Sequence, residues 1–183
     1  MKGVVVYRGK YGATRDYAVW MGDLLGMPVV DAADTDGSIL MGCDPIVIGS
    51  SVYIGKLLAG DWMKKNLSML KNKKLFLFIV CGTPVEEHEQ LERIVRKNVP
   101  MEIRNRCEIF FLRGRMRRKD LSFGDRLLLR VGALFAKTRS QRERMLTDFD
   151  NVSKINIVPL VDKVNMFLGV DKKNKIRREH AEG

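Results

Sequence analysis

The chain has 183 residues, of which 45% are hydrophobic and 30% are charged, and its net charge is +11. This length suits one α/β domain with a hydrophobic core and excludes two domains of ordinary size. The composition excludes a largely disordered chain, and no apolar run reaches the roughly 18 residues that a membrane-spanning helix needs.

Short apolar runs alternate with helical periodicity along most of the chain, a pattern typical of a parallel sheet built from βα units. The expected strands are residues 2–7, 27–32, 45–49, 74–82 and 107–114. The expected helices are residues 14–25, 57–70, 86–98 and 156–168. The strand 74–82 is the most apolar run, which predicts a central position with both faces covered.

The regular alternation stops after the fifth strand. Residues 113–144 contain eleven Lys and Arg against three Asp and Glu, so this segment carries a net +8 and leaves only +3 to the rest of the chain. We therefore predict a flavodoxin-like doubly wound five-stranded parallel sheet with a basic helical insertion around the last strand. The expected division is a domain at 1–170, with the insertion at about 113–144, and a frayed charged tail at 171–183.

The three cysteines, Cys43, Cys81 and Cys107, show no CxxC spacing and no neighbouring histidine cluster. We interpret them as reduced thiols of a cytoplasmic protein, without a metal or a disulfide. Because a strand pattern begins almost at residue 1, no signal peptide is expected.

Glycine, serine and threonine follow three of the expected strands, in residues 8–14, 50–55 and 81–83. In doubly wound sheets the ligand lies outside the carboxyl ends of the strands, and small residues there let backbone N–H groups approach a phosphate. The first loop opens directly into a helix, but it lacks both GxxxxGK[ST] and GxGxxG. A mononucleotide is therefore the expected ligand.

The segments VVVYRGKYGATRDYA, IVIGSSVYIGK and especially FFLRGRMRRKDLSFGDRLLLRVGALFAKT resemble the menaquinone-dependent protoporphyrinogen IX dehydrogenase family. These proteins resemble flavodoxins with a long insertion around the last strand. The resemblance covers about residues 2–168 and implies FMN as the cofactor.

By this resemblance, one loop holds the FMN phosphate and two others flank the flavin ring. The phosphate loop comprises Arg8, Gly9, Lys10, Tyr11, Gly12, Ala13 and Thr14. The ring-flanking residues are Ser50, Ser51, Val52, Tyr53, Ile54, Gly55, Cys81, Gly82 and Thr83. Flavodoxin phosphate loops usually begin with two hydroxyl residues, whereas here Arg8 and Gly9 hold those positions. We expect a cation, Arg8 or Lys10, to replace the hydroxyl contacts.

Within the insertion, apolar residues at helical spacing form one stripe: Leu127, Leu128, Val131, Leu134 and Phe135. Cations flank the stripe or precede it, namely Arg113, Arg115, Arg117, Arg118, Arg126, Arg130 and Lys137. Such a helix can lie in an anionic membrane surface, or it can pack its stripe against the domain. The cations near the strand end can alternatively meet the carboxylates of a porphyrin.

The resemblance implies an FMN-dependent enzyme of heme biosynthesis that passes electrons from a tetrapyrrole precursor, a porphyrinogen, through flavin to a quinone at the inner face of the cell membrane. No catalytic acid or base is assigned, because the flavin would carry the redox chemistry. The alternative is an electron carrier that docks a redox partner through the insertion. A nucleic-acid partner is not expected, because few aromatic residues interleave with the basic run. The sequence does not indicate an oligomeric state.

Overall fold

The computed structural model describes residues 3–35, 37–84, 86–136 and 138–170. The predicted tail 171–183 and Lys137 therefore lie outside the described residues. The main sheet contains β1 (Val4–Arg8), β2 (Val29–Asp31), β3 (Ile46–Tyr53), β4 (Lys56–Leu57), β5 (Leu75–Cys81) and β6 (Cys107–Arg113). The five parallel strands run in the order β2-β1-β3-β5-β6, and β4 pairs antiparallel with β3. This strand order is that of a flavodoxin-like doubly wound sheet, so the predicted fold class is confirmed.

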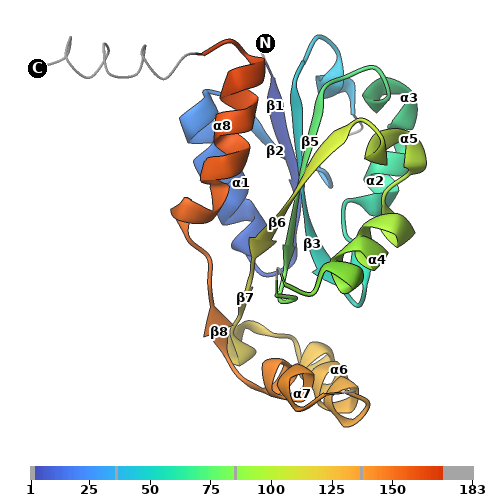
Figure 1. Cartoon of the computed structure of the whole chain (residues 1–183), viewed down its shortest axis with the longest axis vertical. Coiled ribbons are helices and arrows are strands. Elements are labelled where there is room, and N and C mark those ends of the chain that lie inside the picture. Colours follow the sequence, from blue (N-terminus) through green and yellow to red (C-terminus); the bar gives the residue numbers. More distant parts are fainter. Residues whose placement is uncertain (1–2, 36, 85, 137, 171–183) are drawn as a thin grey trace, which may run out of the picture.

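Helices cover both faces of the sheet (Figure 1). One layer contains α1 (Ala13–Leu25) and α8 (Val158–Phe167), which follows the 3-10 turn η3 (Lys154–Ile157). The other contains α2 (Gly60–Lys65), α3 (Leu67–Leu70), α4 (His88–Asn98) and α5 (Met101–Arg104). A further 3-10 turn, η1 (Ser38–Leu40), lies between β2 and β3.

The strand alternation divides the core between these two layers. Side chains such as Ile46, Ile48 and Leu77 belong to the cluster with Trp62 and Ile94, on the side of α2 to α5. Their neighbours along the strands, including Val47 and Phe78, belong to the cluster with Tyr17 and Leu160, on the side of α1 and α8. Because both faces are covered, all seven residues of β5 are buried, which explains its continuous apolar sequence.

Two details of the predicted fold are wrong, one in the sheet and one in a helix. The middle strand is β3, with β5 beside it. The segment predicted as one helix at 57–70 instead begins with the end of β4 and then forms two short helices. Asn66 lies between these helices, fully buried, and its side-chain amide donates to the Trp62 carbonyl 2.9 Å away. The Asn66 backbone N–H also donates to this carbonyl at 3.1 Å, so both groups of Asn66 bond to Trp62 where α2 ends.

The basic segment forms a separate lobe beyond the carboxyl ends of the strands (Figure 1). It contains β7 (Arg115–Met116), the 3-10 turn η2 (Arg118–Asp120), α6 (Phe123–Leu134), α7 (Arg139–Leu146) and β8 (Phe149–Asp150). β7 and β8 pair antiparallel and form the neck of the lobe, with Arg115 opposite Asp150 and Met116 opposite Phe149. The insertion thus continues past residue 144 to the end of β8.

Candidate functional site at the carboxyl ends of the strands

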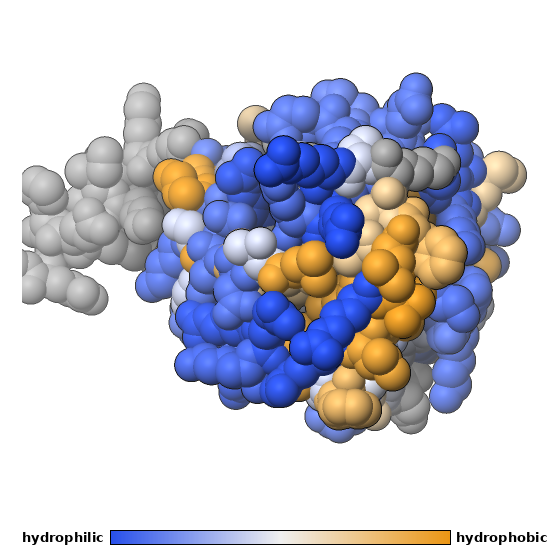
Figure 2. Space-filling model, turned by 90° about the horizontal axis from the view of Figure 1, so that it is seen from below, coloured by the Kyte–Doolittle hydropathy of each residue, from blue (hydrophilic) through white to orange (hydrophobic). Residues whose placement is uncertain are grey.

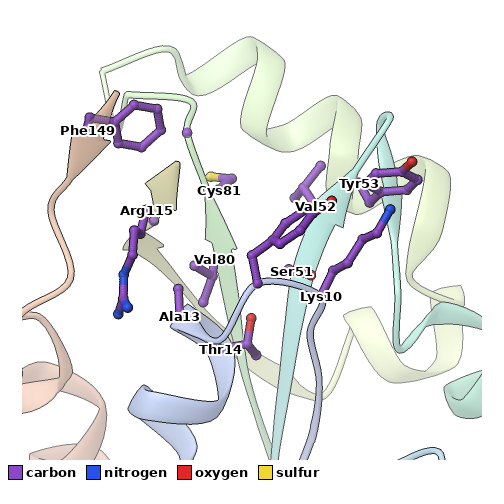
Figure 3. Close-up of a pocket in the computed structure, with 13 residues that line it drawn as sticks. Lys10, Ala13, Thr14, Ser51, Val52, Tyr53, Val80, Cys81, Arg115 and Phe149 are labelled. Carbon is purple, nitrogen blue, oxygen red and sulfur yellow. The ribbon is translucent and has the colours of Figure 1, made fainter. Parts of the chain in front are cut away.

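A cavity of about 100 Å³ lies where the loops after β1, β3 and β5 meet the start of the insertion (Figure 3). Its walls are formed by Lys10, Tyr11, Ala13, Thr14, Ser51, Val52, Tyr53, Val80, Cys81, Gly82, Gly114, Arg115 and Phe149. The Lys10 side chain extends toward Tyr53, on the opposite side of the cavity from Arg115 and Phe149 (Figure 3). The three predicted loops therefore meet at one place.

The loop after β1 is shaped around the first turn of α1. Gly12 precedes the helix with a φ of 86°, which an L-residue with a side chain rarely adopts, and no side chain caps the helix there. Thr14 is buried, and a Cβ on Gly9 would lie 2.7 Å from the Cβ of Thr14. Gly9 is thus required by the packing of Thr14, so a larger hydroxyl residue does not fit at this position.

Arg8 points away from this loop. Its guanidinium Nη1 lies 3.1 Å from Asp31 Oδ1, at the end of the neighbouring strand β2. Lys10 is therefore the cation of the loop that lines the cavity.

The loop after β3 contributes Ser51 with a buried hydroxyl oxygen that has no hydrogen-bond partner among the described residues. A buried hydroxyl without a partner is costly unless a ligand or water completes it. The adjacent Ser50 is satisfied internally, since its hydroxyl accepts from the Ala59 N–H at 3.0 Å and donates to the Ser51 carbonyl at 3.2 Å. Ser51, and not Ser50, is the residue that can serve a ligand.

A carboxylate from the insertion joins the first two loops. Asp125 is buried and accepts hydrogen bonds from Lys10 Nζ at 2.7 Å, from the Tyr11 hydroxyl, and from the Tyr53 hydroxyl at 2.6 Å. The Lys10 ammonium also lies 4.0 Å from the centre of the Tyr53 ring. The hydrogen bond with Asp125 raises the pKa of Lys10, so this ammonium stays charged at neutral pH.

A second cavity, of about 370 Å³, adjoins the first and shares Cys81, Gly82, Gly114 and Phe149 with it. The Phe149 ring packs against Gly82. Burial raises the pKa of the Cys81 thiol, which therefore stays protonated at neutral pH. The part that the two cavities share is uncharged and suited to a flat ring, whereas Arg113, Glu143, Arg144 and Asp148 line the rest of the second cavity.

The structure gathers most of the predicted cofactor residues but not all of them. Nine line the first cavity, and Thr83 lines the second. The other six predicted residues line neither of these two cavities: Arg8, Gly9, Gly12, Ser50, Ile54 and Gly55. Ile54 and Gly55 form the turn between β3 and β4, with φ values of 51° and 69°. Phe149 and Asp125 were not predicted as site residues. The spacing from Ser122 to Asp125 could have placed the acid in the first turn of a helix, but it gives no sign that the acid contacts Lys10.

Several of the predicted substrate or membrane cations are bound within the protein. Arg115 pairs with Asp16 and with Asp150, and Arg117 Nη2 lies 2.6 Å from Asp150 Oδ2. Arg118 and Arg126 donate to backbone carbonyls of the insertion. Within the described residues, no ion pair or hydrogen bond engages the side chain of Arg113 or Arg130, so among the predicted contact residues these two exposed cations are available to an anionic partner.

The helix α6 presents its apolar stripe to solvent. Asp125 and Ala133 are buried toward the rest of the protein. The exposed apolar side chains are Phe123 at 83%, Leu127 at 52%, Leu128 at 42%, Val131 at 43% and Leu134 at 73%, followed by Phe135 at 80% just after the helix. Figure 2 shows apolar side chains gathered with hydrophilic ones beside them at this end of the molecule. The sequence left two alternatives for this stripe, packing against the domain or contact with a membrane surface. The exposed side chains show that the stripe does not pack against the domain.

The described part of the chain has no helix long and apolar enough to cross a membrane. It also has no group of three or more His, Cys, Asp or Glu residues able to hold a metal ion, and its three cysteines are free thiols.

The residues present fit a flavin mononucleotide. An uncapped helix N-terminus can receive a phosphate, Lys10 supplies a cation, and Ser51 offers an unsatisfied hydroxyl. Pockets for ligands of this size are about 300–1,000 Å³, so the first cavity alone is too small and the adjoining second cavity supplies the remaining room. Sheet and site together define a mononucleotide-binding domain of the flavodoxin-like class.

Comparison with known families gives the more specific assignment. The flavodoxin domain family matches residues 4–143, and the chain belongs to this family. The matched region includes α6 as well as the sheet. Family membership implies flavin binding and a role in electron transfer.

Solved structures similar to this chain include flavodoxins. Flavodoxin 2 of Bacillus cereus is 20% identical, with a TM-score of 0.48, over 62% of this chain and 84% of that one. Flavodoxin 1 of Bacillus cereus is 18% identical, with a TM-score of 0.48, over 66% and 89%. A flavodoxin from the Archaea is 21% identical, with a TM-score of 0.41, over 66% and 88%. No curated protein matches the chain.

Proposed function

We propose that this protein is an FMN-dependent dehydrogenase that oxidises a tetrapyrrole precursor with a quinone as electron acceptor, as its resemblance to the protoporphyrinogen IX dehydrogenases implies. The observation that carries the proposal is the solvent-exposed apolar stripe of α6, on the same helix whose Asp125 contacts Lys10 at the cofactor cavity. A plain electron carrier has no evident need of such a helix beside its cofactor.

The protein's own residues would bind and orient the cofactor. The N-terminus of α1 and Lys10 would hold the phosphate, Ser51 would donate to or accept from the ring system, and Tyr53 would lie beside it. Bound FMN would supply the redox chemistry, which these side chains lack. In each two-electron turnover the precursor loses two hydrogen atoms and the quinone gains two to become a quinol.

The insertion would bring this site to the membrane that holds the quinone. Exposed apolar side chains on α6 can enter the interface between headgroups and acyl chains. Arg113 and Arg130, whose side chains have no hydrogen-bond or ion-pair partner among the described residues, can face anionic lipid, and each cation near such a surface contributes about 1 kcal/mol. The remaining cations of the insertion are largely committed to internal contacts, so the membrane contact depends on the apolar stripe more than on charge.

A second candidate function is an electron carrier that docks an acidic redox partner. The same two unpaired arginines favour it, because exposed cations steer encounters with a negatively charged surface. It predicts binding that weakens steeply with salt and no turnover of a small molecule.

The test begins with an absorbance spectrum of the purified protein before and after addition of FMN. Flavin bands that remain through gel filtration would support cofactor binding. The loaded protein is then mixed with protoporphyrinogen and menaquinone, and the appearance of porphyrin is followed by fluorescence. Flavin binding without porphyrin formation with any quinone would refute the dehydrogenase and leave the carrier.

A further inference from the structure

We infer that Asp125 is a positioning residue of the flavin site, which sets the charge and orientation of Lys10, Tyr11 and Tyr53 from the insertion. This inference rests on the proposed flavin site and adds to it a residue outside the three strand-end loops. It makes the insertion a component of the cofactor site as well as a surface for membrane contact.

The geometry of Asp125 carries the inference. It is 7% exposed and is the one acidic residue among the buried side chains of the described chain. Its Oδ2 accepts from Lys10 Nζ and the Tyr11 hydroxyl, and its Oδ1 accepts from the Tyr53 hydroxyl. A purely structural anchor for α6 would need only one such partner, whereas all three donors here belong to side chains that line the cofactor cavity.

The first turn of α6 holds the carboxylate in place. The Ser122 hydroxyl caps the helix by accepting from the Asp125 N–H at 3.2 Å. A carboxylate in the first turn interacts favourably with the helix dipole. The helix cap and the hydrogen bond from Lys10 therefore hold the Asp125 side chain at one place beside the cavity.

The charge of Asp125 compensates that of Lys10. The ammonium lies 2.7 Å from the carboxylate, so an incoming phosphate meets a nearly neutral pair in place of a free cation. Removal of the carboxylate should strengthen the binding of FMN relative to riboflavin, which lacks the phosphate. Removal of the cation should do the opposite, because it leaves an unpaired carboxylate near the phosphate loop.

Orientation gives a second consequence that does not depend on the phosphate. Two phenols donate to one carboxylate, which fixes the positions of the Tyr11 and Tyr53 rings at the mouth of the cavity. Loss of these bonds should weaken binding of both flavins, since a ring that must be ordered on binding costs conformational entropy.

The experiment compares dissociation constants for FMN and riboflavin, measured by flavin fluorescence in low salt. The variants are Asp125→Asn, which keeps the shape and removes the charge, Lys10→Met, which keeps the aliphatic stem, and the double variant. Asp120→Asn is the matched control, because it removes the same charge from an exposed position in the same insertion. Circular dichroism establishes that each variant is folded.

For Asp125→Asn we expect weaker riboflavin binding and an FMN-to-riboflavin affinity ratio about five- to tenfold above that of the unmodified protein. For Lys10→Met the ratio should fall by a similar factor, and the double variant should return close to the original ratio. Asp120→Asn should change neither constant by more than about twofold.

Two results would overturn the inference, and they are distinguishable. If both flavins bind but the ratio is the same in every variant, Asp125 is a structural anchor and the proposed function is unaffected. If the unmodified protein binds neither flavin, the proposed function fails and the positioning role fails with it.

Discussion

Replacement of both Leu134 and Phe135 by serine should abolish most of the protein's affinity for anionic lipid vesicles. These side chains are 73% and 80% exposed, so about three-quarters of each is free to leave water on membrane contact. Full burial of a Leu or Phe side chain contributes about 1.5–3 kcal/mol. The two together therefore account for about 3 kcal/mol of binding free energy, which corresponds to a roughly 150-fold weaker partition coefficient.

The assay is co-sedimentation with vesicles of mixed neutral and anionic lipid at fixed ionic strength. Met166→Ser is the control, because Met166 is 73% exposed on α8, away from the insertion. Substitutions at exposed positions of this kind change the free energy of unfolding by about 0.5 kcal/mol or less, so both variants should remain folded. The reasoning is refuted if the double variant binds vesicles within about threefold of the unmodified protein, or if Met166→Ser loses as much.

Three further predictions concern stability and reactivity. Tyr17→Phe should lower the free energy of unfolding by about 1–3 kcal/mol in urea titrations, because the buried hydroxyl donates to the carbonyl at the end of β6 (2.8 Å) and accepts from the Asn156 amide (2.7 Å). Gly9→Ser, which restores a hydroxyl typical of flavodoxin loops, should weaken FMN binding, because its Cβ would collide with Thr14; a tighter complex would contradict this. Burial raises the pKa of Cys107 from 9.0 to about 12. At pH 8 a thiol reagent should therefore label Cys107 about 1,000-fold more slowly in the folded protein than in the denatured chain, because the thiolate is the reactive form. Since the folded state holds this proton more tightly than the unfolded chain, the associated stability is complete below about pH 9 and is lost as pH rises toward 12.

The parts of the fold set by local pattern were predictable. The continuous apolar sequence of β5 and the periodicity of α1 follow directly from burial on two faces or on one. The break between α2 and α3 was not predictable, because it depends on the buried Asn66 side chain, and asparagine is equally common in exposed turns. The length of β3 was underestimated because its second half, SSVY, begins with two serines, and serine is not among the residues enriched in strands.

Part of the candidate site was likewise predictable from the sequence, and part depends on tertiary structure. Parallel strands place their carboxyl ends at one edge, so the convergence of Lys10, Ser51 and Cys81 follows from the fold class alone. The contacts of Asp125 with Lys10 and Tyr53 span 115 and 72 residues of sequence, and no local pattern specifies them. The commitment of insertion cations to acids elsewhere in the chain, such as Arg115 to Asp16, also depends on tertiary structure, and a count of net charge overstates what is free to bind a partner.

The neck formed by β7 and β8 makes the insertion a module that can be detached from the sheet. The Asn151 N–H donates to the Gly114 carbonyl at 3.2 Å, so the chain leaves the sheet and returns to it at adjacent points. A tight turn from residue 114 to residue 151 would close the gap without altering strand order or either layer of helices. The same junction would accept a lobe of different size, and this architecture therefore allows the surface that meets the partner to be exchanged while the sheet and its helices stay as they are. The contacts that the insertion makes with the cavity, including those of Phe149 and Asp125, would change with it.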